Sequence, residues 1–463
     1  MVKRLIFGIR IQRLLLTCLI MAFVLSGCSG GTNEAGNDDK EIKKETAAPT
    51  PKPTPEVQKP QEPVKLVVWI WESAKKVIDL NMEAFKAEYP HIDVEFQIMG
   101  AGDVYSKFLI ASNTADKVPD IVTLETSNLA QMVAIDGLLD LTGQVSPYKD
   151  KMNQYKWADA TLDGKLYAMP WDSGPVVMFY RKDLFEKSGF SSDPTEVANS
   201  LKTWENYYQY AKTIKEKTGA FMLSDSKTST NARNFETMMW QRGLWYYGDD
   251  GKVTLDSPGV IELGNYVVKM TNEGYVYDAE PWSESWLNGI KNGKVATIVG
   301  ASWFDGLLSS WIDTEGIGKW AVAPMPKWSE SDKFGSANDG GSNFTINKNS
   351  GHPKEAWQFI EFMLGKETSQ TKMLKEGGFF PSLESTYSDP AYNDPVAYFG
   401  GQQVRSIFVE AVKQIRPQAY TKDFPVANQM MKDTFAEIFL NKKTADEMFK
   451  KAADELRKKT KRE

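Results

Sequence analysis

The alternation of apolar, strand-like runs with amphipathic segments is the feature that most constrains the fold of this chain. Runs rich in β-forming residues read VKLVVWIW, IDVEFQIM and VPDIVTLE, at 64–71, 92–99 and 118–125. Segments with helical spacing of apolar residues follow them, at 72–90, 103–113 and 127–141. Strand–helix–strand order predicts a parallel sheet with helices on both faces. The expected fold class is therefore α/β, with ligands bound at the carboxyl ends of the strands.

The length of the chain predicts more than one lobe. A chain of 463 residues is too long for one small core. Joints rich in Pro or Gly occur at 164–189, 319–328 and 376–382, and each is expected to be a crossing between lobes. Between the first two joints, residues 202–219 form an amphipathic segment, with Thr203 placed as its N-cap and Gly219 just past its end.

Composition excludes several classes of function. The formal net charge of −6 argues against a nucleic-acid partner. The two cysteines, Cys18 and Cys28, both precede the folded part, and His91 and His352 are the only histidines. The folded part therefore has too few Cys and His residues for disulfides, zinc sites or Ser-His-Asp catalysis, and no metal or cofactor is expected. GIKNGKV departs from the phosphate-loop spacing, and DDG at 249–251 is expected to be a hairpin turn rather than a calcium loop.

The N-terminus has the pattern of an export signal. Four basic residues, Lys3, Arg4, Arg10 and Arg13, precede an apolar run over 14–25 that is too short to span a bilayer as a mature helix. The run ends in LSGC at 25–28, which resembles the bacterial lipobox, in which the cysteine becomes lipid-modified after cleavage. The alternative is a plain secretory signal with an incidental cysteine. Removal of residues 1–27 takes away four positive charges and no negative one, so the net charge shifts from −6 to −10.

Residues 28–63 are expected to tether the folded part to a lipid anchor on Cys28. They contain almost no large apolar side chains and therefore cannot build a core. The PTPKPTP stretch favours an extended chain and the Gly/Asn stretch a flexible one. This organisation predicts a protein on the outer face of the cytoplasmic membrane, anchored by fatty acyl groups such as palmitate.

The whole chain from about residue 64 to 460 resembles the bacterial extracellular solute-binding proteins of carbohydrate ABC importers, the group that contains maltose-binding protein. The segments that carry this resemblance are LVVWIW, AFKAEYPHIDVEF, VPDIV, DGKLYAMPWDSGPVVMFYRKDLFEKSGF, KTWENYYQYAKTI, NGKVATIVGASWFDG, KWAVAPMP, GGSNFTINKNSGHPKEAWQFIEFM and FGGQQVRSIF. The resemblance implies a type II periplasmic-binding-protein-like fold with two discontinuous lobes joined by hinge crossings. Lobe 1 would comprise residues 64–172 and 327–376, and lobe 2 residues 173–326 and 377–463.

Aromatic candidates for the ligand site are tryptophans at strand ends and near the crossings. A sugar has apolar C–H faces and a rim of hydroxyls, so its site needs flat aromatic platforms and polar partners. Trp303, in IVGASWFDG, aligns with the stacking tryptophan of the family. Trp71, Trp171 and Trp240 are further candidates. The alternative for each is a core tryptophan.

The polar candidates are acids, a glycine and an amide. Glu72 and Glu125 follow predicted strands, Asp172 lies in the first joint, Asp305 follows Trp303, and Asp339 and Gly341 belong to an NDGGS loop. The resemblance adds Asn428, at a position where relatives often have an aromatic residue. Glu72 has an alternative role as a helix cap, Glu125 as a solvated acid, and the Gly pair as a simple tight turn.

The expected function follows from the anchor, the fold and the resemblance together. The protein is expected to be a monomeric, non-enzymatic binding protein that captures a mono- or oligosaccharide and passes it to the permease subunits of an ABC transporter. A sugar sensor docking on a membrane receptor and a glycoside-active enzyme, which needs two carboxylates across the sugar, are the alternatives. A fourth possibility keeps the fold and changes the ligand to a polyamine, peptide or metal chelate.

Overall fold

The computed structural model describes residues 62–114, 118–418 and 420–463. Residues 60–463 form one compact unit. The expected signal peptide, Cys28 and all but the last two residues of the expected tether lie outside the described residues. Among the described helices, none is both long and apolar enough to cross a membrane.

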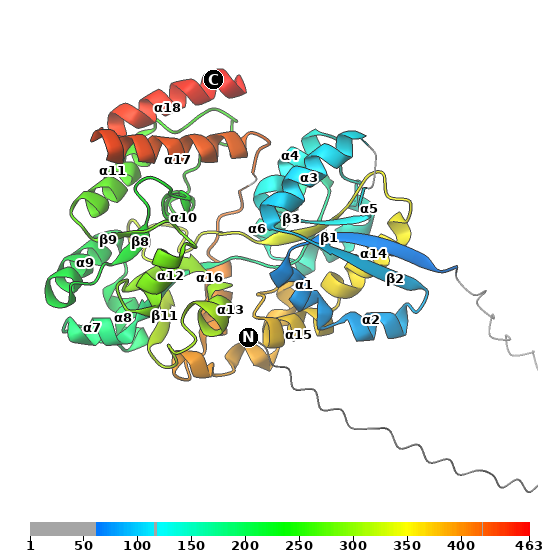
Figure 1. Ribbon diagram of the computed structural model, residues 1–463, viewed down its shortest axis with the longest axis horizontal. Coiled ribbons are helices and arrows are strands. Elements are labelled where there is room, and N and C mark those ends of the chain that lie inside the picture. Colours follow the sequence, from blue (N-terminus) through cyan, green and yellow to red (C-terminus); the bar gives the residue numbers. More distant parts are fainter. Residues whose placement is uncertain (1–61, 115–117, 419) are drawn as a thin grey trace, which may run out of the picture. The chain divides into compact units, whose positions relative to one another are not determined.

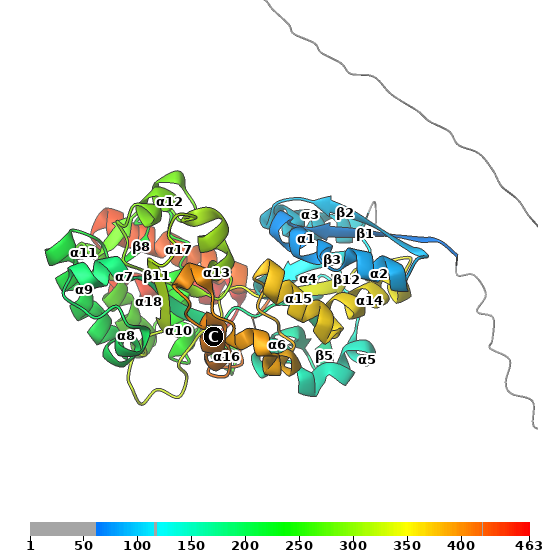
Figure 2. The same ribbon diagram turned by 90° about the horizontal axis from the view of Figure 1, so that it is seen from below.

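Buried apolar side chains gather in two separate cores, and we call the parts built around them lobe 1 and lobe 2 (Figures 1 and 2). The elements of lobe 1 are β1 (Val64–Ile70), α1 (Glu72–Asp79), α2 (Met82–Glu88), β2 (Ile92–Ile98), α3 (Ala101–Thr114), β3 (Ile121–Glu125), α4 (Thr126–Ala134), α5 (Thr142–Val145), η1 (Ser146–Lys151), α6 (Gln154–Ala160), β4 (Thr161–Leu162), β5 (Lys165–Leu166), β6 (Met169–Pro170), β12 (Ser342–Ile346), α14 (Pro353–Ile360), η3 (Glu361–Gly365) and α15 (Glu367–Gly377).

Lobe 2 is built from the middle and the C-terminal part of the chain. Its elements are β7 (Val176–Arg181), α7 (Lys182–Lys187), α8 (Pro194–Ser200), α9 (Trp204–Thr218), β8 (Leu223–Asp225), α10 (Arg233–Gln241), α11 (Pro258–Asn272), β9 (Val276–Asp278), α12 (Glu284–Lys291), β10 (Thr297–Ala301), α13 (Phe304–Leu307), η2 (Leu308–Ile312), β11 (Trp320–Pro324), η4 (Glu384–Ser388), η5 (Pro390–Asn393), η6 (Ala397–Phe399), α16 (Val404–Val412), α17 (Phe424–Asn441) and α18 (Ala445–Thr460).

The sheet of lobe 1 has the strand order β2-β1-β3-β12-β6. The first three strands are parallel, as their alternation with helices predicts, and β1 pairs with β2 along its whole length, from Val64 opposite Ile92 to Ile70 opposite Ile98. The parallel arrangement predicted for these three strands is confirmed, and β12 and β6, which that pattern does not cover, complete the sheet with antiparallel pairs. β12 enters after the second crossing rather than through a crossover helix, so no rule imposes a parallel direction on it.

The predicted helix over 72–90 is two helices. The break falls at Asn81, which is buried and donates its side-chain amide to the carbonyl of Ser369 at 3.1 Å. The apolar spacing alone gives no sign of this contact.

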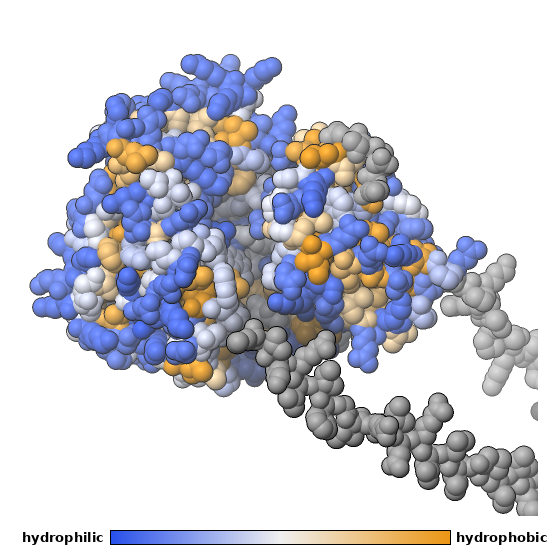
Figure 3. Space-filling view, viewed as in Figure 1, coloured by the Kyte–Doolittle hydropathy of each residue, from blue (hydrophilic) through white to orange (hydrophobic). Residues whose placement is uncertain are grey.

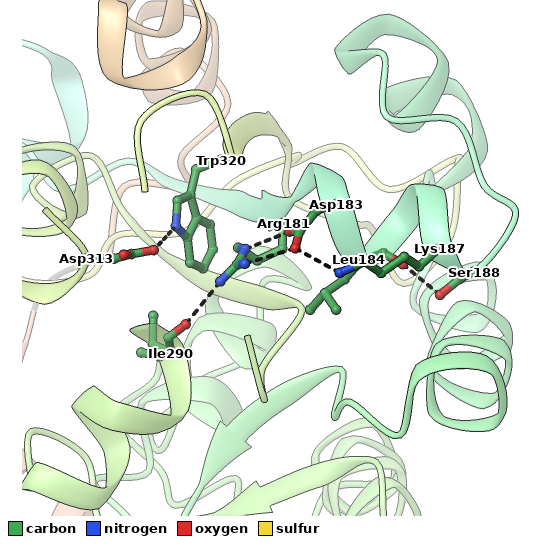
Figure 4. Close-up of polar contacts among 8 residues, drawn as sticks. All are labelled: Arg181, Asp183, Leu184, Lys187, Ser188, Ile290, Asp313 and Trp320. Carbon is green, nitrogen blue, oxygen red and sulfur yellow. Dashed lines mark hydrogen bonds and ion pairs between the residues drawn. The ribbon is translucent and has the colours of Figure 1, made fainter. Parts of the chain in front are cut away.

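The sheet of lobe 2 is antiparallel, in the order β10-β7-β11, and every residue of β7 is buried. At its end, the guanidinium of Arg181 pairs with Asp183 at 2.8 Å and donates to the carbonyl of Ile290 at 3.3 Å (Figure 4). The ring of Trp320 lies beside the same guanidinium and donates its N–H to Asp313. These contacts tie β7 to α7, α12 and β11, so the sheet that carries Trp303 at the end of β10 is held from several sides.

Local signals in lobe 2 behave as the sequence predicts. Thr203 accepts a hydrogen bond from the backbone of Asn206 at 3.2 Å, and Gly219 ends α9 with φ of +74°. The DDG segment is a hairpin turn, with Tyr247 opposite Val253 and Gly251 at a φ of +77°.

The chain passes between the two cores inside the first and third predicted joints and, for the second crossing, after the predicted joint, between Ala337 and Phe344. The crossings bond to one another. The backbone N–H of Ser173 donates to Phe380 at 2.8 Å, and that of Asp339 donates to Gly174 at 2.9 Å. A Cβ at Gly174 would lie 2.2 Å from the carbonyl oxygen of Asp339, so this close approach requires glycine. Figure 3 shows the surface hollowed between the two lobes. The predicted lobe boundaries remain a prediction at the level of single residues.

Candidate ligand-binding site

Three segments of lobe 1 bring polar groups to one edge of its sheet. Glu125 ends β3 and lies opposite Ser342, the first residue of β12. The backbone N–H of Ser342 donates to the carboxylate of Asp172 at 2.6 Å. Thr126, which begins α4, donates its backbone N–H to the carbonyl of Gly341 at 3.0 Å. The structure therefore brings Glu125, Asp172 and the NDGGS loop together at this edge.

The NDGGS loop needs glycine for its backbone conformation. Gly340 and Gly341 have φ of +80° and +83°, where a side chain is strained. A Cβ at Gly341 would lie 3.0 Å from Nζ of Lys156 and 3.1 Å from the carbonyl oxygen of Asp172. The Gly pair therefore turns the chain sharply and also lets it approach its neighbours closely, which places Asp339 beside lobe 2.

Arg233 of lobe 2 reaches Asp339. It is the first residue of α10, and its Nε lies 3.2 Å from one carboxylate oxygen of Asp339 while Nη1 donates to the other at 3.3 Å. The side chain of Asp339 is only 6% exposed and that of Arg233 is 32% exposed. A two-point pair of this kind fixes both planes. The pair joins the second crossing to lobe 2.

Trp303 contacts the same loop. It follows β10 and precedes α13, its indole N–H donates to the carbonyl of Asp339 at 2.9 Å, and the ring is half-buried. Phe304 lies against it at a centroid distance of 4.2 Å with 25° between the rings, and the guanidinium carbon of Arg233 lies 5.2 Å from the Trp303 centroid. The ring is therefore held at a fixed angle beside Arg233 and Asp339, and not inside the core of lobe 2.

Burial controls the charge state of the carboxylates in this group. It raises the pKa of Glu125, Asp172 and Asp339 above the ordinary range. Arg233 opposes this rise at Glu125 and Asp339, and Lys156 opposes it at Asp172. The two cations therefore reduce the rise that burial causes, but the pKa of each acid remains above its ordinary value.

Lys156 of α6 lies beneath the loop and is fully buried. Its ammonium donates to the hydroxyl of Thr126 at 2.7 Å, and burial lowers its pKa while Asp159 and Asp172 oppose this. Asp159 is buried too, and neither of its carboxylate oxygens has a hydrogen-bond partner among the described residues. Burial raises the pKa of Asp159, which favours its protonated form.

Asn428 belongs to a polar group at the start of α10. Its side-chain amide donates to Glu236 at 2.7 Å, and the hydroxyl of Tyr246 donates to the same carboxylate oxygen at 2.7 Å. Burial raises the pKa of Glu236 to about 7, and Arg233 is among the groups that oppose the rise. Asn428 therefore bonds to the helix that carries Arg233, and it is connected to Asp339 only indirectly, through Glu236 and Arg233.

Two of the candidate tryptophans lie in cores. Trp171 is 1% exposed and stacks on Phe379 with 4.8 Å between centroids, inside the core of lobe 1. Trp240 is also 1% exposed, packs on Trp245 and donates its N–H to the carbonyl of Arg416 at 2.9 Å. In this structure neither ring is available as a surface platform. Both are core tryptophans, which was the alternative to a ligand-binding role.

The remaining candidates lie at the edges of the group. Trp71 and Glu72 follow β1, which is the neighbour of β3 in the sheet; Trp71 is half-buried, and Glu72 is exposed and pairs with Lys76 at 3.4 Å. Asp305 is half-buried, and burial raises its pKa to about 6 while Arg405 opposes this. The structure thus brings together Glu125, Asp172, Trp303, Asp339 and Gly341.

Sequence reasoning missed Arg233, Lys156 and Glu236. Arg233 and Glu236 lie in a mixed polar segment without a motif, and Lys156 looks like an ordinary surface lysine in QYKWADA. The available signal was charge balance, because buried acids at strand ends need cations nearby. Within the described residues, no group of three or more His, Cys, Asp and Glu side chains is placed to hold a metal ion.

Known proteins are similar to this chain in sequence and in fold. The lactose-binding protein of Rhizobium radiobacter is 28% identical over 364 residues, which cover 76% of this chain and 82% of the relative. The arabinooligosaccharide-binding protein of Halalkalibacterium halodurans is 24% identical over 405 residues, which cover 83% and 87%. An ABC-transporter-associated binding protein from B. animalis subsp. lactis, solved with β-1,6-galactobiose, is 26% identical with a TM-score of 0.72, covering 86% of this chain and 97% of that one.

The family assignment rests on the sequence of the folded part. Residues 82–400 match the family model described as bacterial extracellular solute-binding protein. The solved relatives are two-lobed sugar-binding proteins of the type II architecture, which confirms the fold class expected from the sequence. Since the family model spans more than half of it, this chain belongs to the bacterial extracellular solute-binding proteins.

Proposed function

We propose that the protein captures a mono- or oligosaccharide between its two lobes outside the cytoplasmic membrane and delivers it to the permease subunits of an ABC transporter. The names of its relatives support a carbohydrate, since they bind lactose or arabino-oligosaccharides and one solved relative holds a galactobiose. The protein would act as a monomer, without cofactor and without catalysing a reaction.

The observation that carries this proposal is the position of Trp303 beside Arg233 and Asp339. Trp303 offers a flat apolar ring, while Arg233 donates and Asp339 accepts hydrogen bonds. A sugar presents both an apolar face and hydroxyl groups, so such a combination suits it. Glu125 and Asp172 supply further acceptors from lobe 1.

Binding would be signalled to the permease by the relative position of the lobes. A ligand that contacts Trp303 of lobe 2 and Glu125 of lobe 1 together stabilises only those arrangements in which both reach it. The three bonded crossings, at Ser173 and Gly174, at Asp339 and at Phe380, are the segments that would absorb such a movement.

The site is tested by calorimetric titration of the full chain with mono- and disaccharides, among them galactose, lactose and β-1,6-galactobiose. Saturable binding with one sugar per chain supports the proposal. The same mixtures are analysed afterwards for shortened sugars, because turnover would identify a glycoside-active enzyme instead. Binding of spermidine or a peptide in place of every sugar would replace the ligand class.

The anchor is tested separately, by changing Cys28→Ser in the full chain and fractionating the cells. The unchanged protein is expected in the membrane fraction with a lipid-modified cysteine detectable by mass spectrometry. The variant is expected to lose the modification. A wild-type protein that is cleaved and secreted without lipid would support the plain secretory signal.

A further inference from the structure

A buried lysine beneath the NDGGS loop is bonded to the segments on both sides of it. The ammonium of Lys156 donates to the hydroxyl of Thr126 at 2.7 Å and to the carbonyl of Ser342 at 3.4 Å. The Thr126 hydroxyl in turn donates to the carbonyl of Gly341 at 3.1 Å, and the backbone N–H of Ser342 donates to Asp172 at 2.6 Å. One ammonium is therefore connected to the start of α4, to the end of the NDGGS loop and to a carboxylate of the candidate site.

The next acid on the same helix has no partner. Asp159 lies three residues after Lys156 on α6, the spacing at which two side chains of a helix face each other. Lys156 is 0% exposed and Asp159 is 3% exposed. Among the residues that the structure describes, neither carboxylate oxygen of Asp159 accepts a hydrogen bond. A carboxyl buried without partners favours its protonated form, so Lys156 gives its hydrogen bonds to Thr126 and Ser342 instead.

The other ionisable groups that face this pair are two carboxylates near the ammonium and two tyrosines near the carboxyl, namely Glu125, Asp172, Tyr155 and Tyr420. The two carboxylates adjoin α4 and β6, which pack against α6, and β4, which packs there too, carries no ionisable residue. Burial raises the pKa of both tyrosines well above the ordinary value, so they stay neutral while the pair titrates.

We propose that Lys156 is a positioning residue of the ligand site and that Asp159 is the competing partner of its ammonium. While Asp159 is protonated, the ammonium stays on Thr126 and Ser342, and the NDGGS loop keeps the shape in which its acceptors face the ligand. Loss of one proton to water ends this state. Either Asp159 ionises and attracts the ammonium, or Lys156 becomes neutral and no longer supports the charge of Asp172. This inference rests on the proposed function, since it concerns the same site.

The direction of the pH effect follows from the burial of both groups. Burial raises the pKa of Asp159 above its ordinary value and lowers the pKa of Lys156 below its own. Those ordinary values are about 3.9 and about 10.4, and the pair loses its first proton between them. The state in which the ammonium holds the loop is therefore complete on the acid side and is lost as the pH rises, so sugar affinity falls with rising pH.

The test is calorimetric titration of the full chain with galactose, lactose and β-1,6-galactobiose at about pH 6, 7, 8 and 9. For a sugar that binds, the wild type is expected to lose at least about fivefold in affinity between the two ends of this range. Asp159→Asn keeps the shape of the side chain but has no proton to release, so its affinity should fall much less over the same range. Lys156→Met lacks the ammonium and should bind about 5- to 50-fold more weakly than the wild type at about pH 6.

The matched control is Asp150→Asn, which makes the same change at an exposed acid of lobe 1 and should reproduce the wild-type affinity at every pH. Thermal unfolding of each variant is recorded alongside. If Lys156→Met does not fold, the comparison of Asp159→Asn with the wild type still decides, because that variant retains the lysine.

A wild-type affinity that does not fall with rising pH overturns the inference. A fall of the same size in Asp159→Asn overturns it too, because the responsible group then lies outside the pair. If no sugar binds the wild type at any pH, the proposed function fails and this inference fails with it. If a sugar binds without these differences, only the role given to Lys156 and Asp159 fails.

Discussion

Arg233 connects side chains that come from separate segments of the chain. It pairs with the buried carboxylate of Asp339, lies beside the ring of Trp303 and opposes the rise that burial causes in the pKa of Glu125. Removing one partner of a buried pair leaves the other charge without compensation, which costs more than the pair contributes. At the residue scale, the site therefore depends on a cation that no motif marks.

Arg233→Met tests this dependence. The variant is expected to lose about 1–3 kcal/mol of unfolding free energy at pH 7, because Asp339 is left buried without its ion-pair partner. The double variant Arg233→Met/Asp339→Asn should recover part of the loss. Urea denaturation measures both. Lys202→Met, which removes an exposed pair with Glu330 at 3.6 Å, should cost less than about 1 kcal/mol. Equal losses in Arg233→Met and Lys202→Met would contradict the account.

Asp305 predicts a pH dependence of stability. Burial raises its pKa to about 6 in the folded protein, whereas an unfolded aspartate titrates near about 3.9. Between these two values the folded chain retains a proton that the unfolded chain has lost, so stability falls as the pH rises through this window. Asp305→Asn removes the titration. It should match the wild type at about pH 4 and exceed it by up to about 3 kcal/mol at pH 7.

Thermal unfolding between pH 4 and pH 8 measures the effect of Asp305→Asn. Asp150→Asn, on an exposed side chain, is the matched control and should leave the pH profile unchanged. A profile of Asp305→Asn that runs parallel to that of the wild type would show that the Asp305 carboxyl is not the group responsible.

At the residue scale, the sequence predicts which residues lie near the site better than it predicts the residues they contact. Residues such as Glu125 and Asp339 could be named because strand ends and a Gly-rich turn are local signals. Trp171, Trp240 and Trp303 look alike in sequence, yet two are 1% exposed and one is half-buried. The difference arises from segments far away in the chain, such as Phe379 against Trp171, and no local pattern records such contacts.

At the scale of elements, the NDGGS loop decides where β12 enters the sheet of lobe 1. Its backbone places Ser342 opposite Glu125 and the Gly341 carbonyl against Thr126. The antiparallel direction of β12 could not be predicted, because the chain reaches this strand from lobe 2 and not through a crossover helix. The parallel pairing of β1, β2 and β3 could be predicted, because strands joined by helical crossovers in one sheet run parallel.

Gly341→Ala tests the geometry of this loop against a matched glycine. Gly341 and Gly274 have φ of +83° and +82°, but a Cβ at Gly341 meets Lys156 and Asp172 at 3.0 and 3.1 Å, whereas a Cβ at Gly274 meets nothing within 4 Å. Both alanine variants should lose about 1–2 kcal/mol from the left-handed backbone. Gly341→Ala should lose at least about 1 kcal/mol more, from crowding, and should also weaken sugar binding. Equal melting temperatures for the two variants would refute the role given to this loop.

At the scale of the whole molecule, the chain forms two cores and crosses between them three times. Hydrogen bonds between the crossings hold them together. The first and third crossings lie where Pro and Gly interrupt the strand pattern, so these two could be predicted from the sequence, whereas the second falls after the predicted joint. What the sequence could not supply is the bonding between them, such as Asp339 to Gly174 and Ser173 to Phe380, because it pairs residues more than 150 positions apart. The proposed function requires that a ligand reach both lobes beside these crossings.

The central claim is that a sugar binds on Trp303 beside Asp339 and Arg233. Calorimetric titration of wild type, Trp303→Phe and Trp303→Ala with the same sugar tests it most directly, with thermal unfolding of each variant recorded alongside. We expect Trp303→Ala to lose about 1–3 kcal/mol of binding free energy without early unfolding, and Trp303→Phe, which keeps a ring but not the N–H donated to Asp339, to lose less. A Trp303→Ala variant that melts early while its affinity for the sugar holds would show that the ring serves the core of lobe 2 instead.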